Sequence, residues 1–539
     1  MWAKNLMFWA VCAAGVLTLA AAILPSSDTP SGIRSVETKV DSDSFRSVVE
    51  QVNTAFRGAW QARGITPAPR ADQLTVARRL SLGVTGTIPS LEEVRLIEAH
   101  QQTNTTAWWL DRLLADRRSA EYLAERWARV FVGVEDGPFL RYRRRRFAAW
   151  LSDQLFANRP YDELVRELIA AEGVWTDSPA ANYVTATLDS NNDDRPDPDK
   201  LAGRTVRAFL GVRLDCVRCH DDFLGGDWLQ KDYQGIAAYY ARTRTGWTGI
   251  RDVDEGEYET DDEKPQPVEP CIPFQKDLSI EGGTRREQLA QWVTHRENRA
   301  FARTAVNRSW ATLFGRPLVE PIDSIPLDDE VPAALDLLAD DFVANGFDFR
   351  RLLHLIAATE VFHLDSRAAE GTQLSQKHDE HWAAFPVRRL RPEQVIGSLV
   401  QAASLKTLDH ESHILIRTIR AGNKNEFIKR YGDMGEDEFD DRGGTIPQRL
   451  LMMNGKIVSE LIKHNPVFGT ASGRILMLSP NDPTTIETAY LAVLTRRPSK
   501  EESAHFGARF ADPPADNRSY QMEDMFWSLI NSTEFSWNH

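Results

Sequence analysis

The sequence of 539 residues contains only four cysteines, and this scarcity excludes a fold held together by disulfide bonds. Basic residues are also in deficit, because 64 Lys and Arg stand against 78 Asp and Glu and give a net charge of −14. Nucleic acids and anionic lipid surfaces both require a basic face. The composition therefore argues against nucleic acid as a partner.

Catalytic signatures with a fixed spacing are missing as well. The sequence has no G-x-S-x-G elbow, no phosphate-binding P-loop, no G-x-G-x-x-G and no H-E-x-x-H. Long alternation of apolar and polar residues, which is typical of strands, is scarce. Apolar residues nevertheless make up 42% of the chain, which is enough for a sizeable core. We expect a mainly α fold and assign no enzyme class.

One long apolar run stands near the start of the sequence. Leu6–Leu24 contains 19 residues without a charge, a length that just spans a bilayer. Residues 1–24 are therefore predicted to be a signal anchor or a signal peptide. Lys4 predicts that the body lies on the periplasmic or extracytoplasmic side of the inner membrane. Residues 25–44, rich in Ser, Thr, Asp and Pro, are predicted to be a flexible tether.

Two helical domains are expected after the tether. Residues 45–250 form the first, where apolar residues recur at spacings of three and four, as in Val52, Phe56 and Trp60. Residues 251–283 are predicted to be an acidic, Pro-containing linker, since nine acidic and two basic residues fall within 251–270. A cation-binding loop is the alternative for this stretch, although its carboxylates lack a regular ligand spacing with a turn glycine. Residues 284–539 form the second helical domain.

Two of the four cysteines lie close together in the stretch RLDCVRCHDDF, residues 213–223. Cys216 and Cys219 are three residues apart, and His220 follows directly. A c-type haem uses this C-x-x-C-H pattern, with two thiols joined to the vinyl groups and the imidazole bound to iron. The sequence thus predicts haem c, attached through Cys216 and Cys219 and ligated by His220. We expect these three residues on one face, near the end of an amphipathic helix whose apolar positions are Val206, Phe209, Leu210, Leu214 and Val217.

Other interpretations of the motif stay open. Zinc or another metal could be held by the same three residues together with Cys271 or an aspartate. The two cysteines could also form a plain disulfide or a redox pair, or the pattern could be a coincidence. A sixth iron ligand cannot be read from the pattern. Residue type alone offers these candidates: Met452, Met453, Met477 and His295.

Three further polar clusters are interpreted as solvated surface. His378 with His381, and His410 with His413, each place two imidazoles at a spacing of three, which could bridge a metal. Clusters of this composition are usually exposed, so we do not predict a metal site there. The basic run Arg141–Arg146 precedes an apolar helical stripe and is predicted to be a solvated helix face.

Several stretches carry a resemblance to one exported bacterial family. GITPAPRADQLTVARRLSLGVTGTIPSLEEV, NRPYDELVRELIAAEG and FLGVRLDCVRCHDDF resemble the planctomycete cytochrome-c-like (PSCyt-type) domain of unknown function. LAQWVTHRENRAFARTAVNRSWATLFGRPLVEPID, TIPQRLLMMNGKIV and MFWSLINSTEFSWNH resemble the planctomycete-specific (PSD-type) domain that follows it in such proteins. The resemblance covers nearly everything after residue 45. It implies an exported, mostly helical two-domain protein with a haem-c motif at Cys216, Cys219 and His220, and it implies no activity.

The chain departs from that family at the motif itself. Members often continue C-x-x-C-H with a second histidine and a proline before a phenylalanine, whereas here Asp222 precedes Phe223. A second histidine ligand is therefore not expected. The first functional hypothesis is a membrane-tethered haem protein in electron transfer or an oxidoreductase step, with a redox partner protein. The second is a structural or binding protein whose motif holds a metal or a disulfide. An enzyme acting on exported polymers is a third.

Overall fold

The computed structural model describes residues 42–539, with gaps at 101–103, 135–141, 189–194, 222–227, 261–264, 328–330, 370, 409–425, 433–443, 464–469 and 512–517. The predicted signal segment 1–24 and nearly all of the predicted tether 25–44 lie outside the described residues. Within the described residues, no helix is both long enough and apolar enough to span a membrane.

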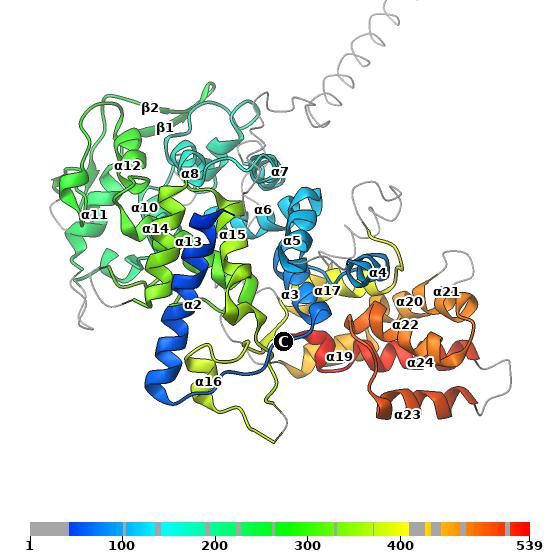
Figure 1. Ribbon diagram of the computed structural model, residues 1–539. Helices are drawn as coiled ribbons and strands as arrows, with labels where there is room; N and C mark the ends of the chain where they lie inside the picture. Colours follow the sequence, from blue (N-terminus) through cyan, green and yellow to red (C-terminus); the bar gives the residue numbers. More distant parts are fainter. Residues whose placement is uncertain are drawn as a thin grey trace, which may run out of the picture. The chain divides into compact units, whose positions relative to one another are not determined.

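The described part of the chain is mainly helical, as expected from the sequence (Figure 1). Its α-helices up to the motif region are α2 (Asp43–Arg63), α3 (Gln73–Thr85), α4 (Leu91–Ala99), α5 (Thr105–Ala115), α6 (Arg117–Val132), α7 (Arg144–Phe156), α8 (Tyr161–Ala170), α9 (Asn182–Thr185), α10 (Pro198–Thr205) and α11 (Gln230–Ala238). The later ones are α12 (Arg285–Val293), α13 (Arg299–Phe314), α14 (Ala333–Ala344), α15 (Phe349–Ala358), α16 (Gln376–Glu380), α17 (Pro392–Ala402), α19 (Ile446–Asn454), α20 (Lys456–Ile462), α21 (Ala471–Leu478), α22 (Asp482–Leu494), α23 (Lys500–Ala511) and α24 (Arg518–Ile530).

Short helical turns and three antiparallel strand pairs complete the described elements. The turns are η1 (Pro179–Ala181), η2 (Val206–Leu210), η3 (Asp215–Arg218), η4 (Lys276–Leu278), η5 (Glu360–His363) and η7 (Glu534–Ser536). The strand pairs are β1 (Thr243–Gly246) with β2 (Gly249–Asp252), β3 (Tyr258–Glu259) with β4 (Pro267–Val268), and β5 (Arg388–Arg389) with β6 (Trp537–Asn538).

Local sequence signals explain where several helices begin and end. The Ser42 side chain accepts a hydrogen bond from a backbone N–H in the first turn of α2, and Gly64 ends that helix in the left-handed conformation at φ 63°. Thr284 and Glu287 form a capping box at the start of α12. The second helical region therefore begins at the predicted residue.

The acidic segment after α11 packs against the first helical region. Composition predicts a solvated linker over 251–283, yet β3 and β4 pair within it. Polar anchors hold the segment, because the Tyr258 hydroxyl donates a hydrogen bond to the Asp199 carboxylate at 2.7 Å. Glu257 also forms ion pairs with Arg242 and Arg285 at 2.6 and 2.7 Å. These contacts supply the order that apolar burial alone does not.

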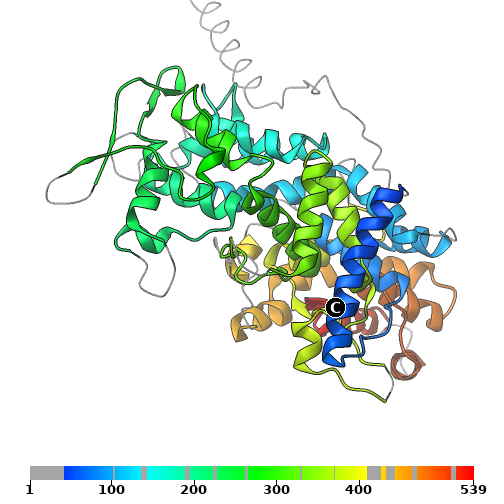
Figure 2. The same cartoon turned by 60° about the vertical axis from the view of Figure 1, so that its left-hand side comes forward.

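The larger hydrophobic core draws on both sequence regions. Its buried residues run from Phe45 to Phe385, and Leu491 of α22 joins them. Helix α2 packs on α14 and α15, α3 packs on α13, and α8 packs on α12, so helices distant in sequence lie side by side (Figures 1 and 2). A second core is built mainly from α17 and α19–α24, and Leu82 and Ile88 of the first region enter it. The two regions of sequence thus share both cores.

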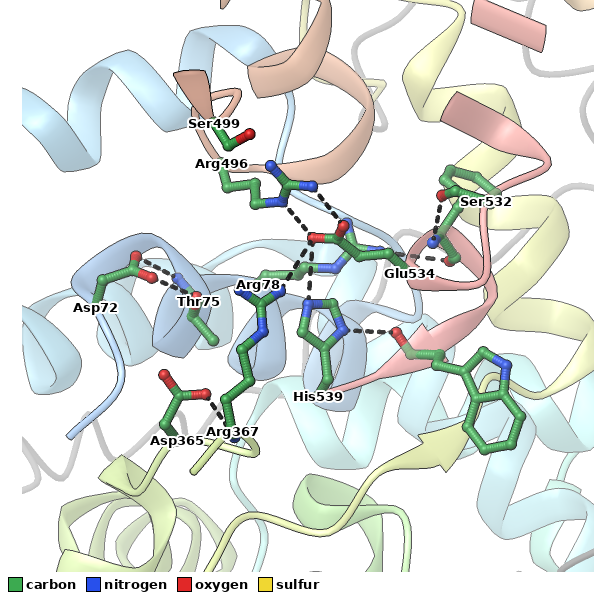
Figure 3. Close-up of polar contacts among 12 residues, drawn as sticks. Asp72, Thr75, Arg78, Asp365, Arg367, Arg496, Ser499, Ser532, Glu534 and His539 are labelled. Atoms are coloured by element: carbon green, nitrogen blue, oxygen red, sulfur yellow. Dashed lines mark hydrogen bonds and ion pairs between the residues drawn. The ribbon is translucent and has the colours of Figure 1, made fainter. Parts of the chain in front are cut away.

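Two adjacent buried arginines on α3, Arg78 and Arg79, connect these cores. Figure 3 shows Arg78. Arg79 donates hydrogen bonds to the carbonyl oxygens of Phe362, Leu364 and His539 at 2.8 to 3.0 Å. Arg78 reaches the carbonyl oxygen of Phe535 at 3.4 Å. Burial lowers the pKa of Arg79 to about 9 and that of Arg78 to about 10.

A buried carboxylate on α17 lies against arginines of α6 and against the arginine that directly precedes α17. Glu393 forms ion pairs with Arg126 of α6 at 3.1 Å and with Arg391 at 3.2 Å. Burial alone would raise the pKa of Glu393, but the charges of Arg126, Arg391 and Arg129 outweigh it and lower the pKa to about 2. Glu393 lines a small hollow of about 80 Å³, which the exposed Glu121 also lines.

Candidate functional site

The chain reaches the cysteine motif through a helix that ends early. Helix α10 continues into a single π-helical turn, η2, and stops at Gly211, which has φ 60°. A Cβ atom at Gly211 would lie 2.6 Å from the Thr304 hydroxyl oxygen. The Ile325 backbone N–H also donates a hydrogen bond to the Gly211 carbonyl at 2.8 Å. Close approach of the second region and a left-handed backbone both require glycine here.

The motif does not lie on the last turns of that helix, so this expectation was wrong. The helix ends at Leu210, and Cys216 belongs to the separate 3₁₀ turn η3. Leu214 and Val217 are buried as predicted, at 1% and 2% exposure, but they anchor η3 rather than extend α10. The apolar spacing predicted the buried positions correctly. It did not predict that the helix ends at Gly211, between Leu210 and Leu214.

The 3₁₀ turn still brings the two cysteine positions together. Residues three apart eclipse one another in such a turn, so the backbone positions of Cys216 and Cys219 fall on the same side. Cys219 is an exposed free thiol, and His220 is exposed beside it. The Cys216 side chain lies outside the described atoms. Two of the three predicted site residues therefore reach the surface next to each other.

Asp323, in the second region, binds two arginines in the segment that leads into the motif. Asp323 binds Arg213 through both of its oxygens, at 2.8 and 2.9 Å, and binds Arg207 at 3.1 Å. Burial would raise the pKa of Asp323, but the hydrogen bonds and charges of Arg213 and Arg207 outweigh it and lower the pKa. Asp323 was missed by sequence reasoning, because no spacing rule relates residues 110 positions apart.

The other side of the turn is held by residues of α10 and α11. Arg218 forms an ion pair with Asp199 at 3.2 Å. The Gln230 side chain donates to the Arg218 carbonyl at 3.0 Å, and its backbone N–H donates to Asp221 at 2.8 Å. The exposed end of η3 is thus fixed from both directions along the chain.

The imidazole of the motif makes a contact that bears on its chemistry. The Nδ1 atom of His220 lies 2.8 Å from the Asp221 carbonyl oxygen. When Nδ1 carries the proton it donates to this oxygen, and Nε2 then carries the lone pair that a metal takes. Such a bond to a backbone carbonyl is a common way of orienting a metal-binding histidine.

The aromatic residues after the motif are mainly core residues. Tyr233, Ile236 and Tyr240 are at most 3% exposed and belong to the larger core. The half-buried Trp228 packs edge-on against Phe274, with ring centroids 6.1 Å apart. The structure does not single these residues out as the wall of a cofactor pocket.

The remaining sequence candidates lie apart in the fold or outside the described residues. Met452 is buried in the second core, Met453 and Met477 are exposed, and His295 accepts a hydrogen bond from the Glu297 backbone. His378 contacts Ser375 and the Thr66 carbonyl oxygen. His410 and His413 lie outside the described residues. In the basic run, Arg144 starts α7 and pairs with Glu125 at 2.9 Å, with 13% of its side chain exposed. Arg145 is exposed, as expected for a solvated helix face.

The metal alternative gains no support from the side chains that are described. Among them, no group of three or more His, Cys, Asp or Glu is placed to hold a metal ion. The Cys216 side chain is not in that set. Cys271, the fourth ligand of the zinc alternative, is exposed and free, and its backbone N–H donates to the Gly235 carbonyl of α11 at 3.2 Å.

Comparison with known families gives two matches. Residues 51–245 match the family model PSCyt2, described as a protein of unknown function (DUF1549). Residues 285–509 match the family model PSD1, described as a protein of unknown function (DUF1553). No curated protein and no solved structure matches the chain. The order of the two matches confirms the resemblance seen in the sequence.

Proposed function

The chain joins a PSCyt2 domain to a PSD1 domain, and from this premise we propose that it is an exported, membrane-tethered haem-c protein. Its role would be electron transfer or an oxidoreductase step on the periplasmic side, with a redox partner protein. The observation that carries the proposal is the motif itself, an exposed, firmly held turn on which Cys219 and His220 are adjacent. The donor set of two thiols and one imidazole fits a c-type haem.

The two cysteines have the attachment role. Each thiol would add across one vinyl group of the haem, so that the S–H bond and the vinyl π bond are replaced by one S–C and one C–H bond, with no net change of oxidation state. Cys216 lies in η3 and Cys219 directly follows it, so the two backbone positions are three residues apart and suit two bonds to one edge of a planar group. Exposure of Cys219 leaves its thiol open to the attachment machinery.

His220 has the ligand role. Its contact with the Asp221 carbonyl supports the tautomer in which Nε2 is the donor. Asp323 acts through Arg213 and keeps the turn in place, so it is a positioning residue. A bound haem would supply one-electron chemistry at this surface, where a partner protein has access.

Haem staining on a denaturing gel tests the proposal, using full-length protein made in a host that attaches c-type haem. Wild type should stain, and the variant with Cys216→Ala and Cys219→Ala should not. His220→Ala should keep the stain but move the absorption spectrum to high spin or to another ligand set. Cys271→Ala is the matched control, because it removes a cysteine outside the motif and should stain like wild type.

The second candidate is a structural or binding protein in which the motif holds a metal or a disulfide. Stoichiometric zinc without a haem band would favour it, and so would an unstained wild type whose motif thiols are oxidised to a disulfide. A zinc site would also lose its metal when any one of Cys216, Cys219 and His220 is replaced. Either result would overturn the haem assignment.

The location is tested separately. Protease added to spheroplasts should degrade the body of the protein, since the apolar run with Lys4 predicts an external body. Protection of the body would refute that orientation. A mature N-terminus near Ile23 would show that the segment is a cleaved signal rather than a permanent anchor.

A further inference from the structure

A cavity far along the chain from the motif has the character of a binding site. It has a volume of about 300 Å³, at the lower end of the range for small-molecule sites. Two stretches that carry the resemblance to the second domain meet there, TIPQRLLMMNGKIV and MFWSLINSTEFSWNH. The first contributes the start of α19, and the second contributes η7 and β6. Neither stretch has a role at the cysteine motif.

Two arginines give the cavity a positive charge. Arg389 of β5 donates to the Gln448 side chain at 2.6 Å and to the Tyr431 hydroxyl at 2.9 Å. Arg449 of α19 donates to the carbonyl oxygen of Asn531. Every one of these acceptors is neutral, so none of them carries a negative charge that would offset the two guanidinium groups at the wall of the cavity.

No carboxylate among the described residues lines this cavity. Glu534, the acid nearest in sequence to the wall residues of η7, is bound by Arg496 at 2.5 Å, and His539 lies 3.5 Å away (Figure 3). Both cavity arginines act on Tyr431, because burial raises the pKa of this hydroxyl and the charges of Arg389 and Arg449 oppose that rise. The two charges thus converge on one buried polar group.

The N-terminus of α19 is already capped by hydrogen bonds within the protein. Thr445 and Gln448 form a capping box, and the Gln448 side chain also donates to the Tyr431 carbonyl at 2.6 Å. The charge that remains for a ligand is that of the two arginines. Apolar groups complete the wall, namely Ile446, Met452 and Trp537, and they favour a ligand with an organic body.

We propose that this cavity binds a small organic oxyanion, a phosphate, sulfate or carboxylate group carried on a body of about one sugar ring. Arg389 and Arg449 would hold the oxyanion, because guanidinium groups match its geometry and charge. Trp537 and Ile446 would contact the ring. The proposal is independent of haem at the motif.

Calorimetric titration of the full-length protein at low ionic strength tests the proposal. The probes are glucose 6-phosphate, glucose 6-sulfate and glucuronate, with neutral glucose for comparison. At least one charged probe should bind saturably and glucose should not. Replacing Arg389→Gln should weaken binding about 10- to 100-fold, the usual effect of losing a hydrogen bond to a charged group.

A second variant guards against a folding defect, because Arg389 also bonds Tyr431 and Gln448. Ile446 is 76% exposed at the cavity wall, so Ile446→Glu should leave the fold intact. Its carboxylate should weaken binding about 3- to 10-fold through repulsion. Ile446→Gln separates the charge from the lost apolar side chain and should retain more affinity than Ile446→Glu. Arg509→Gln, an exposed arginine on α23, is the matched control and should bind like wild type.

Three results would overturn the proposal. The first is the absence of saturable binding for every charged probe, and the second is binding that neither Arg389→Gln nor Ile446→Glu weakens. The third result would show that the cavity binds a segment of the chain itself, because six carboxylates lie between Gly432 and Gly444. If probes bind only after these six are replaced by Asn and Gln, the cavity serves that segment and not a free ligand.

Discussion

Replacing Glu393→Gln should destabilise the contact between α6 and α17 by about 3 kcal/mol. The side chain is 5% exposed and lies between Arg126 and Arg391. Lowering its pKa from 4.5 to about 2 corresponds to about 3 kcal/mol of stability for the ionised form. Removing one partner of a buried ion pair costs about 3 to 5 kcal/mol in other proteins, which agrees with this figure.

The pH dependence follows from the direction of that shift. Because folding lowers the pKa of Glu393, its contribution is complete above about pH 4.5 and is lost as the pH falls from about 4.5 to about 2. The stability difference between wild type and Glu393→Gln should therefore be constant from pH 7 to 5. Below about pH 4 it should shrink by about 1.4 kcal/mol per pH unit.

Hydrogen exchange read by mass spectrometry gives the local measurement, because two cores need not unfold together. Peptides from α6 and α17 should exchange about 100-fold faster in Glu393→Gln at neutral pH. Comparing wild type and variant at each pH cancels the intrinsic exchange rate. Glu121→Gln is the matched control, since this exposed glutamate lines the same hollow. The reasoning would be refuted by a stability difference between wild type and Glu393→Gln below about 0.5 kcal/mol. It would also be refuted by a stability difference that does not become smaller at low pH.

Two other changes test single features of the fold. Gly211→Ala should lower the melting temperature more than Gly64→Ala. Both glycines have a left-handed backbone, but only at Gly211 would a Cβ meet another atom, at 2.6 Å. Equal decreases in melting temperature would show that the approach of Thr304 imposes no constraint. Burial, aided by the charge of Arg70, lowers the pKa of His363 to about 4, so wild type should lose stability as the pH falls from about 6.5 to about 4. Chemical denaturation of His363→Asn across that range should show a weaker pH dependence, and an unchanged slope would contradict the assignment.

Sequence patterns correctly predicted features that depend on residues close together in the chain, such as helix positions and their buried faces. The spacing of Val52, Phe56 and Trp60 predicted α2, since helical period and burial are encoded within a few turns. The second helical region was expected from residue 284, and Thr284 is the N-cap of α12.

Contacts between distant residues decided the features that sequence reasoning missed. The break at Gly211 depends on Thr304 and Ile325, which come about a hundred residues later. Asp323 holds Arg213 for the same non-local reason. The oxyanion cavity combines residues from β5, α19 and β6, and no short window of sequence contains them together. For the break at Gly211 the local signal in the sequence was the glycine itself, and a glycine alone does not reveal which neighbour requires it.

The two buried arginines of α3 find their C-terminal partners late in synthesis of the chain. Arg79 meets its carbonyl partner on His539 only after 460 further residues have been made, and Arg78 waits 457 residues for Phe535. At about 5 to 20 residues per second, this interval is about 20 to 90 seconds. During that time the apolar surface around α3 lacks its final cover and is open to aggregation. The packing of α3 is therefore completed only when residues 535–539 have been made, long after α3 itself.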